Sequence, residues 1–178
     1  MKTKTITLKP PRWDQNNSIY FLTFCTFDRK PYLHRGLIPG MIIDNLIFYA
    51  KRLNELIAYT VMPDHVHLLA AVAKVEHMSD YLRDFKKHTS KEIKKILCIT
   101  PKHVWQRGTM DHCIRVTPEN TDYVNHLNYT YYNSMKHLGI APKDFSFHNF
   151  KEAVRKEWIV EGFASNPPVF PQKFEMYE

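Results

Sequence analysis

The stretch ELIAYTVMPDHVHLLAAV, residues 55–72, constrains the fold more than any other part of the chain. Two runs rich in β-branched, aromatic and aliphatic residues, 55–62 and 65–72, are separated only by Pro63 and Asp64, a pair typical of a tight turn. So short a connection joins antiparallel strands, because parallel neighbours need a crossover of a dozen or more residues. The sequence therefore predicts a β-hairpin near the middle of the chain.

Further strands and helices are expected on both sides of this hairpin. Residues 18–29 alternate and are rich in β formers, and 104–116 also favour a strand. Apolar residues spaced three or four apart predict helices over 37–54, 78–97 and 117–139, and a small helix within 145–163. The order β-α-β-β-α-β-α predicts an α+β fold, with an antiparallel sheet and helices packed on one face, of the ferredoxin-like or RRM-like kind.

Capping residues are expected at the ends of two of these helices. Ser79 can cap the start of the second helix. Thr117 followed by Pro118 is a strong start signal for the third, and Gly139 can end it.

Composition limits the partners and the compartment. The formal charge of +7 favours an anionic partner, nucleic acid or a membrane surface, and 13% aromatic residues suit stacking on single-stranded bases. No apolar run is long enough to predict a membrane span, and the first residues lack the apolar core of a signal peptide, so we expect a cytoplasmic protein. Cys25, Cys98 and Cys113 are odd in number and lack CxxC spacing, which indicates reduced thiols.

Two histidines, His65 and His67, lie one residue apart in the second strand of the hairpin. Successive side chains of a strand alternate between faces, so both imidazoles point the same way and Val66 points the other way. Together they could bind one divalent ion, but a third ligand would have to come from elsewhere in the fold. The alternative is a pair of hydrogen-bonded surface histidines, since ten histidines make this spacing easy to meet by chance.

The predicted helix over 117–139 carries two stripes at helical spacing. The apolar stripe is expected to face the core and contains Val124, Leu127, Tyr131, Met135 and Leu138. The second stripe is polar and contains Asn125, Tyr129 and Asn133, with Tyr132 and Lys136 beside it. If the polar stripe faces the histidines, it places a hydroxyl nucleophile next to an amide oxygen that can bind metal. Any single tyrosine, taken alone, is more consistent with packing in the core or at its rim than with catalysis.

These motifs together resemble a known family. VMPDHVHLLA resembles the His-hydrophobic-His motif of HUH endonucleases. VWQRGTMDHCIR followed by DYVNHLNYTYYNSMKHLG is similar to the C-terminal part of the single-tyrosine transposases of bacterial insertion sequences, most of all the REP-associated tyrosine transposases. YFLTFCTFDRKPYL and DFKKHTSKEI fit the same family. The chain departs from the pattern where Ser134, not proline, follows Asn133, and where one residue is inserted before Gly139.

The resemblance implies roles for individual residues. Tyr129 would be the nucleophile, with Tyr132 as the next candidate, and Asn133 would join His65 and His67 as ligands of Mg²⁺ or Mn²⁺. The implied activity is that of a metal-dependent single-stranded DNA endonuclease and strand transferase, which cleaves near hairpins through a 5′-phosphotyrosine intermediate.

The resemblance also implies a domain organisation. A basic arm over 1–17 would precede a catalytic domain over 18–140, and a C-terminal extension would cover 141–178. The protein would be a monomer or a homodimer.

Basic side chains are the candidates for DNA contacts. They are Lys86, Lys87, Lys91, Arg107 and Arg115. Such residues position a phosphate backbone without reading sequence. The lysines are also consistent with an ordinary solvated helix face.

Two other classes of function compete with this prediction. A non-catalytic single-stranded nucleic-acid-binding α+β domain would share the sheet, but the chain lacks an RNP1-type string and that function leaves the histidines and the polar stripe unexplained. A structural metal-binding domain is disfavoured because the cysteines lie far apart.

Overall fold

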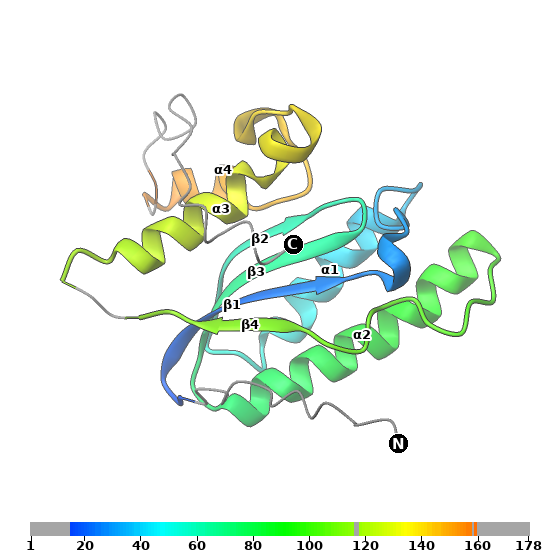
Figure 1. Ribbon diagram of the computed structural model, residues 1–178, viewed down its shortest axis with the longest axis horizontal. Coiled ribbons are helices and arrows are strands. Elements are labelled where there is room, and N and C mark those ends of the chain that lie inside the picture. The colour runs from blue at the N-terminus through cyan, green and yellow to red at the C-terminus, as the bar shows by residue number, and fades with distance from the viewer. Residues whose placement is uncertain (1–14, 116–117, 158, 160–178) are drawn as a thin grey trace, which may run out of the picture.

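The computed structural model describes residues 15–115, 118–157 and 159. Four antiparallel strands form one sheet in the order β2-β3-β1-β4 (Figure 1). The strands are β1 (Ser18–Cys25), β2 (Glu55–Val61), β3 (His65–Val72) and β4 (Met110–Cys113). The predicted α+β fold and its central hairpin, β2–β3, are confirmed.

Four helices and two 3-10 turns connect and follow the strands in the predicted order. They are α1 (Ile38–Ala50), α2 (Val75–Leu97), α3 (Thr121–Leu138), α4 (Phe150–Arg155), η1 (Phe27–Arg29) and η2 (Pro142–Asp144). The predicted strand over 104–116 is reduced to the four residues of β4. Its first part instead buries Trp105, whose indole N–H donates to Thr89 Oγ1 at 3.0 Å and whose ring packs against Phe24 and Phe85.

One face of the sheet packs against α1 and α2. The alternation of β1 points Tyr20, Leu22 and Phe24 to this face, where they join Val66 and Leu68 of β3 in one buried cluster. The helices contribute Ile38, Ile42, Leu46, Met78, Tyr81, Phe85 and Ile93. Each such side chain contributes about 1.5–3 kcal/mol when fully buried. This cluster is therefore the main core.

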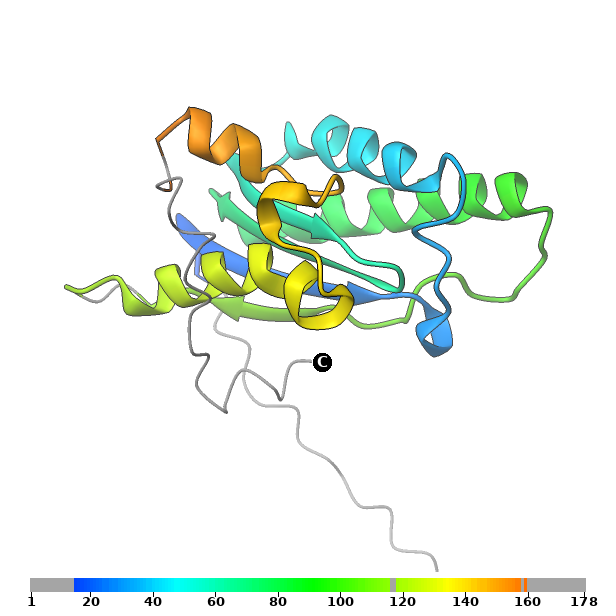
Figure 2. The ribbon, with the colours of Figure 1, turned by 90° about the horizontal axis from the view of Figure 1, so that it is seen from above.

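The other face of the sheet is covered by α3, so helices lie on both faces and not on one as predicted (Figure 2). Phe21 of β1 and Leu69 of β3 form a second buried cluster with Leu127 and Tyr131 of α3. The prediction failed because β3 is buried along nearly its whole length on both faces, and the face that carries the two histidines needs a cover of its own.

Helix α3 is buried on more than one side. Every residue from 126 to 134 is buried, because η2 and α4 pack against the helix in addition to the sheet. Leu127 and Tyr131 lie in the core as predicted, but Val124, Met135 and Leu138 are each about 40% exposed. The prediction of a single apolar stripe was therefore wrong at the two ends of the helix.

The helix ends test the capping predictions. Ser79 does not cap α2, because the helix begins four residues earlier at Val75, and Thr117 lies outside the described residues. Gly139 ends α3 as predicted: its φ of +68° lets its N–H reach the carbonyl of Met135 at 3.0 Å. Among the described helices, none has the length and apolar character needed to cross a membrane.

Asn149 ties the C-terminal segment to the sheet and to α3. Its Oδ1 accepts hydrogen bonds from the Tyr59 N–H at 3.0 Å and the Tyr131 hydroxyl at 3.2 Å. Its Nδ2 donates to the carbonyl of Ile57 at 2.9 Å. One buried amide thus satisfies two main-chain groups of β2 and one side chain of α3.

We expect Asn149→Ala to lower the free energy of unfolding by about 2–4 kcal/mol, because it leaves buried polar groups without partners. Urea denaturation measures this. Asn54→Ala, at an exposed asparagine, should change stability by no more than about 0.5 kcal/mol. Equal effects of the two substitutions would contradict the role given to Asn149.

Candidate active site

His65 and His67 lie side by side on the face of β3 that α3 covers. Their ring centroids are 4.7 Å apart and the ring planes are nearly perpendicular, at 74°. The side chains point the same way, as the alternation predicted, but both residues are buried, at 5% and 1% exposure. The alternative of two surface histidines is therefore wrong.

Each imidazole is held through its Nδ1 by an oxygen atom of a neighbouring residue. Asp64 Oδ1 lies 2.7 Å from His65 Nδ1, and Thr23 Oγ1 lies 2.8 Å from His67 Nδ1. The second contact follows from the register of the sheet, in which Thr23 is paired with His67. Oxygen atoms in these positions orient histidines so that Nε2 is the ligand atom, as in many metal sites.

The surroundings of the two histidines shift the pKa values of Asp64 and His67. Burial opposes the ionisation of Asp64, but its contacts with His65 and with Arg29, whose guanidinium lies 3.4 Å away, outweigh burial and hold the pKa of Asp64 below its ordinary value. Burial, with the charges of His65 and His137, holds the pKa of His67 well below its ordinary value. His67 is therefore neutral at pH 7, the form that binds metal.

Helix α3 brings Tyr129 and Asn133 to the two histidines. Asn133 Oδ1 lies 3.0 Å from His65 Nε2. The Tyr129 ring packs against His67 with centroids 5.1 Å apart, and Lys136 Nζ lies 5.6 Å from the centre of the same ring. The spacing of four residues that suggested one stripe does place both side chains at one site.

Tyr129 is only 2% exposed. A scissile phosphate can reach its hydroxyl only after the site opens, so this arrangement is closed towards a large substrate. Tyr132 is equally buried, and burial raises the pKa of its hydroxyl. The Tyr129 ring is in contact with the His67 ring.

The donor atoms fit a divalent metal ion. His65 Nε2, His67 Nε2 and Asn133 Oδ1 supply two nitrogens and one oxygen at the junction of β3 and α3. His67 Nε2 and Asn133 Nδ2 are buried, and neither has a hydrogen-bond partner within the described part of the chain. A buried imidazole nitrogen that lacks such a partner, beside an amide oxygen, is a suitable donor set for an ion that keeps open positions for substrate.

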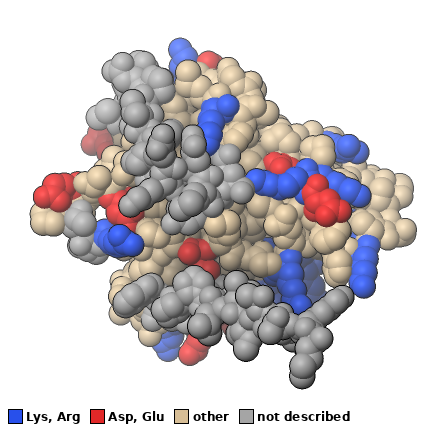
Figure 3. Space-filling model, viewed as in Figure 1, with Lys and Arg blue, Asp and Glu red and all other residues tan. Residues whose placement is uncertain are grey.

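The candidate DNA-binding residues lie apart from this junction. Lys87 and Lys91 are exposed on α2, which covers the opposite face of the sheet, while Arg107 and Arg115 are exposed on either side of β4. On the face seen in Figure 3, basic side chains occur in separate groups with acidic ones between them. Lys86 differs from the others, because its Nζ donates to the Gly108 carbonyl and to Thr109 Oγ1, both at 2.8 Å.

The sequence analysis missed three residues that support the site: Thr23, Arg29 and Asp64. The sequence pattern predicts a turn at Asp64, and the place of this residue directly before a histidine is a usable signal for a role at the site. Thr23 and Arg29 gave no local signal, because only the pairing of β1 with β3 and the turn at η1 bring them to the histidines.

Comparison with known proteins identifies the family of the chain. The family model described as "Transposase IS200 like" matches residues 14–124, a range that includes both histidines and ends before Tyr129. The chain belongs to this transposase family.

Individual relatives narrow the resemblance. A Haemophilus influenzae protein classed with the REP-associated tyrosine transposases is 31% identical over 123 residues, which cover 64% of this chain and 68% of that protein. A solved structure of a REP-associated tyrosine transposase bound to a REP hairpin has the same fold, with a TM-score of 0.72 and 23% identity over 92% of this chain and 95% of that one. The predicted resemblance to the REP-associated transposases is confirmed.

Lys86 provides a pH-dependent prediction. Burial of its ammonium lowers the pKa to about 8, so between pH of about 8 and 10.5 the unfolded chain keeps a proton that the folded chain releases. The stability due to Lys86 should therefore rise with pH across this window, by about 1–2 kcal/mol, since partial exposure reduces the effect. Urea denaturation across this range measures it.

The rise attributed to Lys86 should disappear in Lys86→Arg, because arginine stays protonated throughout the window. Lys87→Arg, at an exposed neighbour, should retain it. An unchanged pH profile in Lys86→Arg would show that other groups cause the rise.

Proposed function

We propose that the protein is a metal-dependent single-stranded DNA endonuclease and strand transferase that uses Tyr129 as its nucleophile. One observation carries the proposal: His65 and His67 of β3 and Tyr129 and Asn133 of α3, more than 60 positions apart in sequence, meet in one buried site. Membership of a transposase family supports action on DNA.

The metal would be held by His65 Nε2, His67 Nε2 and Asn133 Oδ1, and its identity is proposed as Mg²⁺ or Mn²⁺. When bound, such an ion supplies Lewis-acid polarisation of the scissile phosphate. Asp64 and Thr23 hold the two imidazoles so that Nε2 faces the site, and the burial of His67 keeps it neutral. These residues therefore prepare the ligand atoms before DNA arrives.

The chemical step is attack by Tyr129 Oη on phosphorus. The new bond joins Oη to phosphorus, the bond from phosphorus to the 3′ oxygen breaks, the phenol loses a proton and the departing 3′ oxygen gains one. The products are a 5′-phosphotyrosine and a free 3′-OH. Because the link to Tyr129 keeps the energy of the phosphodiester bond, the 3′-OH of another strand can reverse the step without ATP.

The cationic Lys136 is placed to help Tyr129 react. Its Nζ lies 5.6 Å from the centre of the Tyr129 ring. An unperturbed tyrosine has a pKa near 10, so a positive charge close to the ring favours the phenolate that attacks. We propose Lys136 as a residue that positions and activates the nucleophile.

The proposed substrate is DNA near a hairpin, by analogy with the solved relative that was bound to a REP hairpin. The net charge of +7 and the exposed Lys87, Lys91, Arg107 and Arg115 are suited to phosphate contacts. Residues 1–17 and 141–178 are proposed as an arm and an extension that flank the catalytic domain, in a monomer or a homodimer.

A non-catalytic single-stranded nucleic-acid-binding domain is the alternative. The 2% exposure of Tyr129 favours it, because a nucleophile must be reached by its substrate. The alternative does not explain why His67 Nε2 is buried without a hydrogen-bond partner in the described part of the chain, or why both imidazoles are held at Nδ1. We therefore favour the enzyme.

We expect Tyr129→Phe to abolish covalent protein–DNA adducts, because it removes the attacking oxygen and little else. The wild-type protein is incubated with single-stranded hairpin DNA and Mn²⁺ and resolved on a denaturing gel. Tyr132→Phe, the matched control on the same helix, should keep the adduct. Hairpin binding without an adduct in the wild type, under Mg²⁺ and Mn²⁺ alike, would establish the binding domain instead.

Loss of a proposed ligand, or of the residue that orients one, should reduce cleavage while leaving hairpin binding nearly unchanged. We expect His67→Ala to lower the cleavage rate at least about 100-fold and Asp64→Asn to lower it about 10–100-fold, since an oriented imidazole is a better ligand. Single-turnover cleavage at varied Mn²⁺ measures both. His77→Ala, at an exposed histidine on α2, is the control and should cleave normally; an equal loss there would rule out a specific site.

A further inference from the structure

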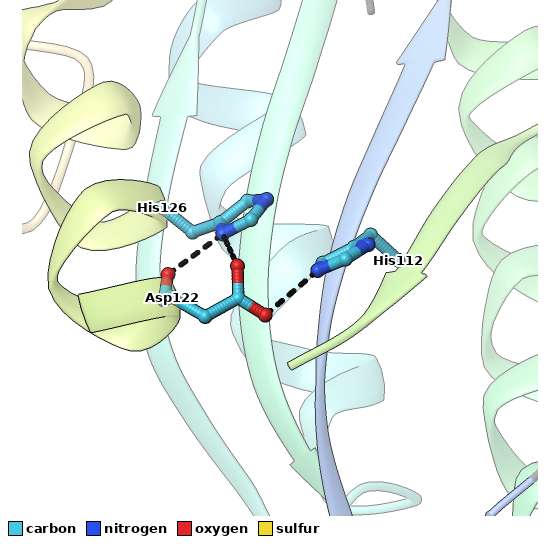
Figure 4. A group of neighbouring side chains, drawn as sticks. All are labelled: His112, Asp122 and His126. Atoms are coloured by element: carbon cyan, nitrogen blue, oxygen red, sulfur yellow. Dashed lines mark hydrogen bonds and ion pairs between the residues drawn. The ribbon is translucent and has the colours of Figure 1, made fainter. Parts of the chain in front are cut away.

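A second group of metal-ligating side chains lies between β4 and the first turns of α3 (Figure 4). It consists of His112 on β4 and of Asp122 and His126, one turn apart on α3. One ligand atom from each lies within 4.8 Å of the others. The Phe21 ring stands between this group and His67, packing on His67 at 5.3 Å and on His126 at 4.8 Å, so the two groups are separate sites.

The carboxylate of Asp122 is arranged as a bridge between the two imidazoles. Its Oδ2 lies 2.9 Å from His112 Nε2, and its Oδ1 lies 3.2 Å from His126 Nδ1. The two rings are stacked, with centroids 4.6 Å apart and planes at 14°. The main-chain N–H of Arg115 donates to Oδ2 at 2.7 Å and fixes the carboxylate from outside the group.

These separations are ordinary for hydrogen bonds and ion pairs, and they are also near the spacing that a metal ion sets between its ligands. A tetrahedral zinc ion at about 2.0–2.1 Å from each ligand keeps the ligand atoms roughly 3.3–3.5 Å apart, close to the two carboxylate–imidazole distances. His126 Nδ1 also lies 2.8 Å from the main-chain oxygen of Asp122, so an ion there would replace the proton that this contact holds. The three ligand atoms lie within 4.8 Å of one another, so they would have to draw together by up to about 1 Å to share one ion.

The charges of the group also match a metal. Burial opposes the ionisation of Asp122, but hydrogen bonds from the Arg115 N–H and His112 outweigh it and hold the pKa of Asp122 below its ordinary value. Burial lowers the pKa of His126, so this imidazole is neutral at pH 7. The side chains of His112 and Asp122 are 20% and 19% exposed, which leaves a route from solvent.

We propose that His112 Nε2, the Asp122 carboxylate and His126 Nδ1 bind one transition-metal ion of the Zn²⁺ class, with water in the fourth position. Two imidazoles, one carboxylate and an open position are a typical zinc donor set. The site would fix β4 to α3 three residues before Tyr129. It is separate from the proposed catalytic metal and does not depend on the proposed function.

The test counts bound ions with Co²⁺, whose visible absorption reports coordination by nitrogen and oxygen. The wild-type protein, His112→Asn, Asp122→Asn and the control His77→Ala are titrated with Co²⁺ at equal protein concentration. We expect His112→Asn and Asp122→Asn each to bind one equivalent less than the wild type, or to bind it at least about tenfold more weakly. His77→Ala, an exposed histidine outside both sites, should match the wild type.

The test depends on the difference in bound Co²⁺ between the variant and the wild type, and not on the total number of ions that the wild type binds. Two equivalents falling to one, or one falling to none, supports the site, and the second case would also show that the catalytic ligands bind no Co²⁺. An unchanged count in His112→Asn overturns the proposal. A measurement on the wild type guards against misfolded variants: Zn²⁺ should shift the imidazole NMR signals of His112 and His126, and shifts confined to His65 and His67 would overturn it.

Discussion

The packing of α3 against the histidine face of the sheet is the constraint on which the rest of the structure depends. It buries Phe21 and Leu69 under Leu127 and Tyr131, and the same packing sets Asn133 Oδ1 at 3.0 Å from His65 Nε2. If the helix were displaced by one turn, its polar side chains would move about 5 Å along the strand and the donor set would be lost. Core packing and site geometry are therefore one property of this interface.

The interface is stabilised from its outer side as well. Asn149, beyond the end of α3, accepts a hydrogen bond from the Tyr131 hydroxyl. It also accepts one from a main-chain N–H of β2 and donates one to a main-chain carbonyl of β2. Ser134 Oγ donates to the carbonyl of Ile140 at 2.9 Å, which holds the chain after the helix close to it. These bonds hold in place the segments that, with the sheet, bury every residue from 126 to 134, including a tyrosine that the proposed chemistry needs to expose. Stability of the closed form and access for DNA are thus opposed at this helix.

His65 and His67 are both held by a neighbouring oxygen atom at the same ring nitrogen, Nδ1. Asp64 and Thr23 take the Nδ1 side of the rings, which leaves the Nε2 side for Asn133 and for a metal. On the far side of the Phe21 ring, Asp122 lies between two other imidazoles and contacts Nε2 of His112 and Nδ1 of His126. One helix therefore faces both β3 and β4, which lie on either side of β1, and its position governs both groups of proposed ligands.

The sequence by itself determined the order of elements, the central hairpin and the common direction of His65 and His67, because these follow from local periodicity and from a two-residue turn. The family motifs also indicated Tyr129 and Asn133, whose spacing of four puts them on one side of a helix. Only the tertiary structure decided that α3 covers the face opposite α1 and α2 and that the histidines are buried. It also decided that Thr23 and Asp122 contact histidines, that Arg29 pairs with Asp64 and that Asn149 joins β2 to α3. These depend on strand register and on contacts between residues far apart in the chain, about which local patterns carry no information.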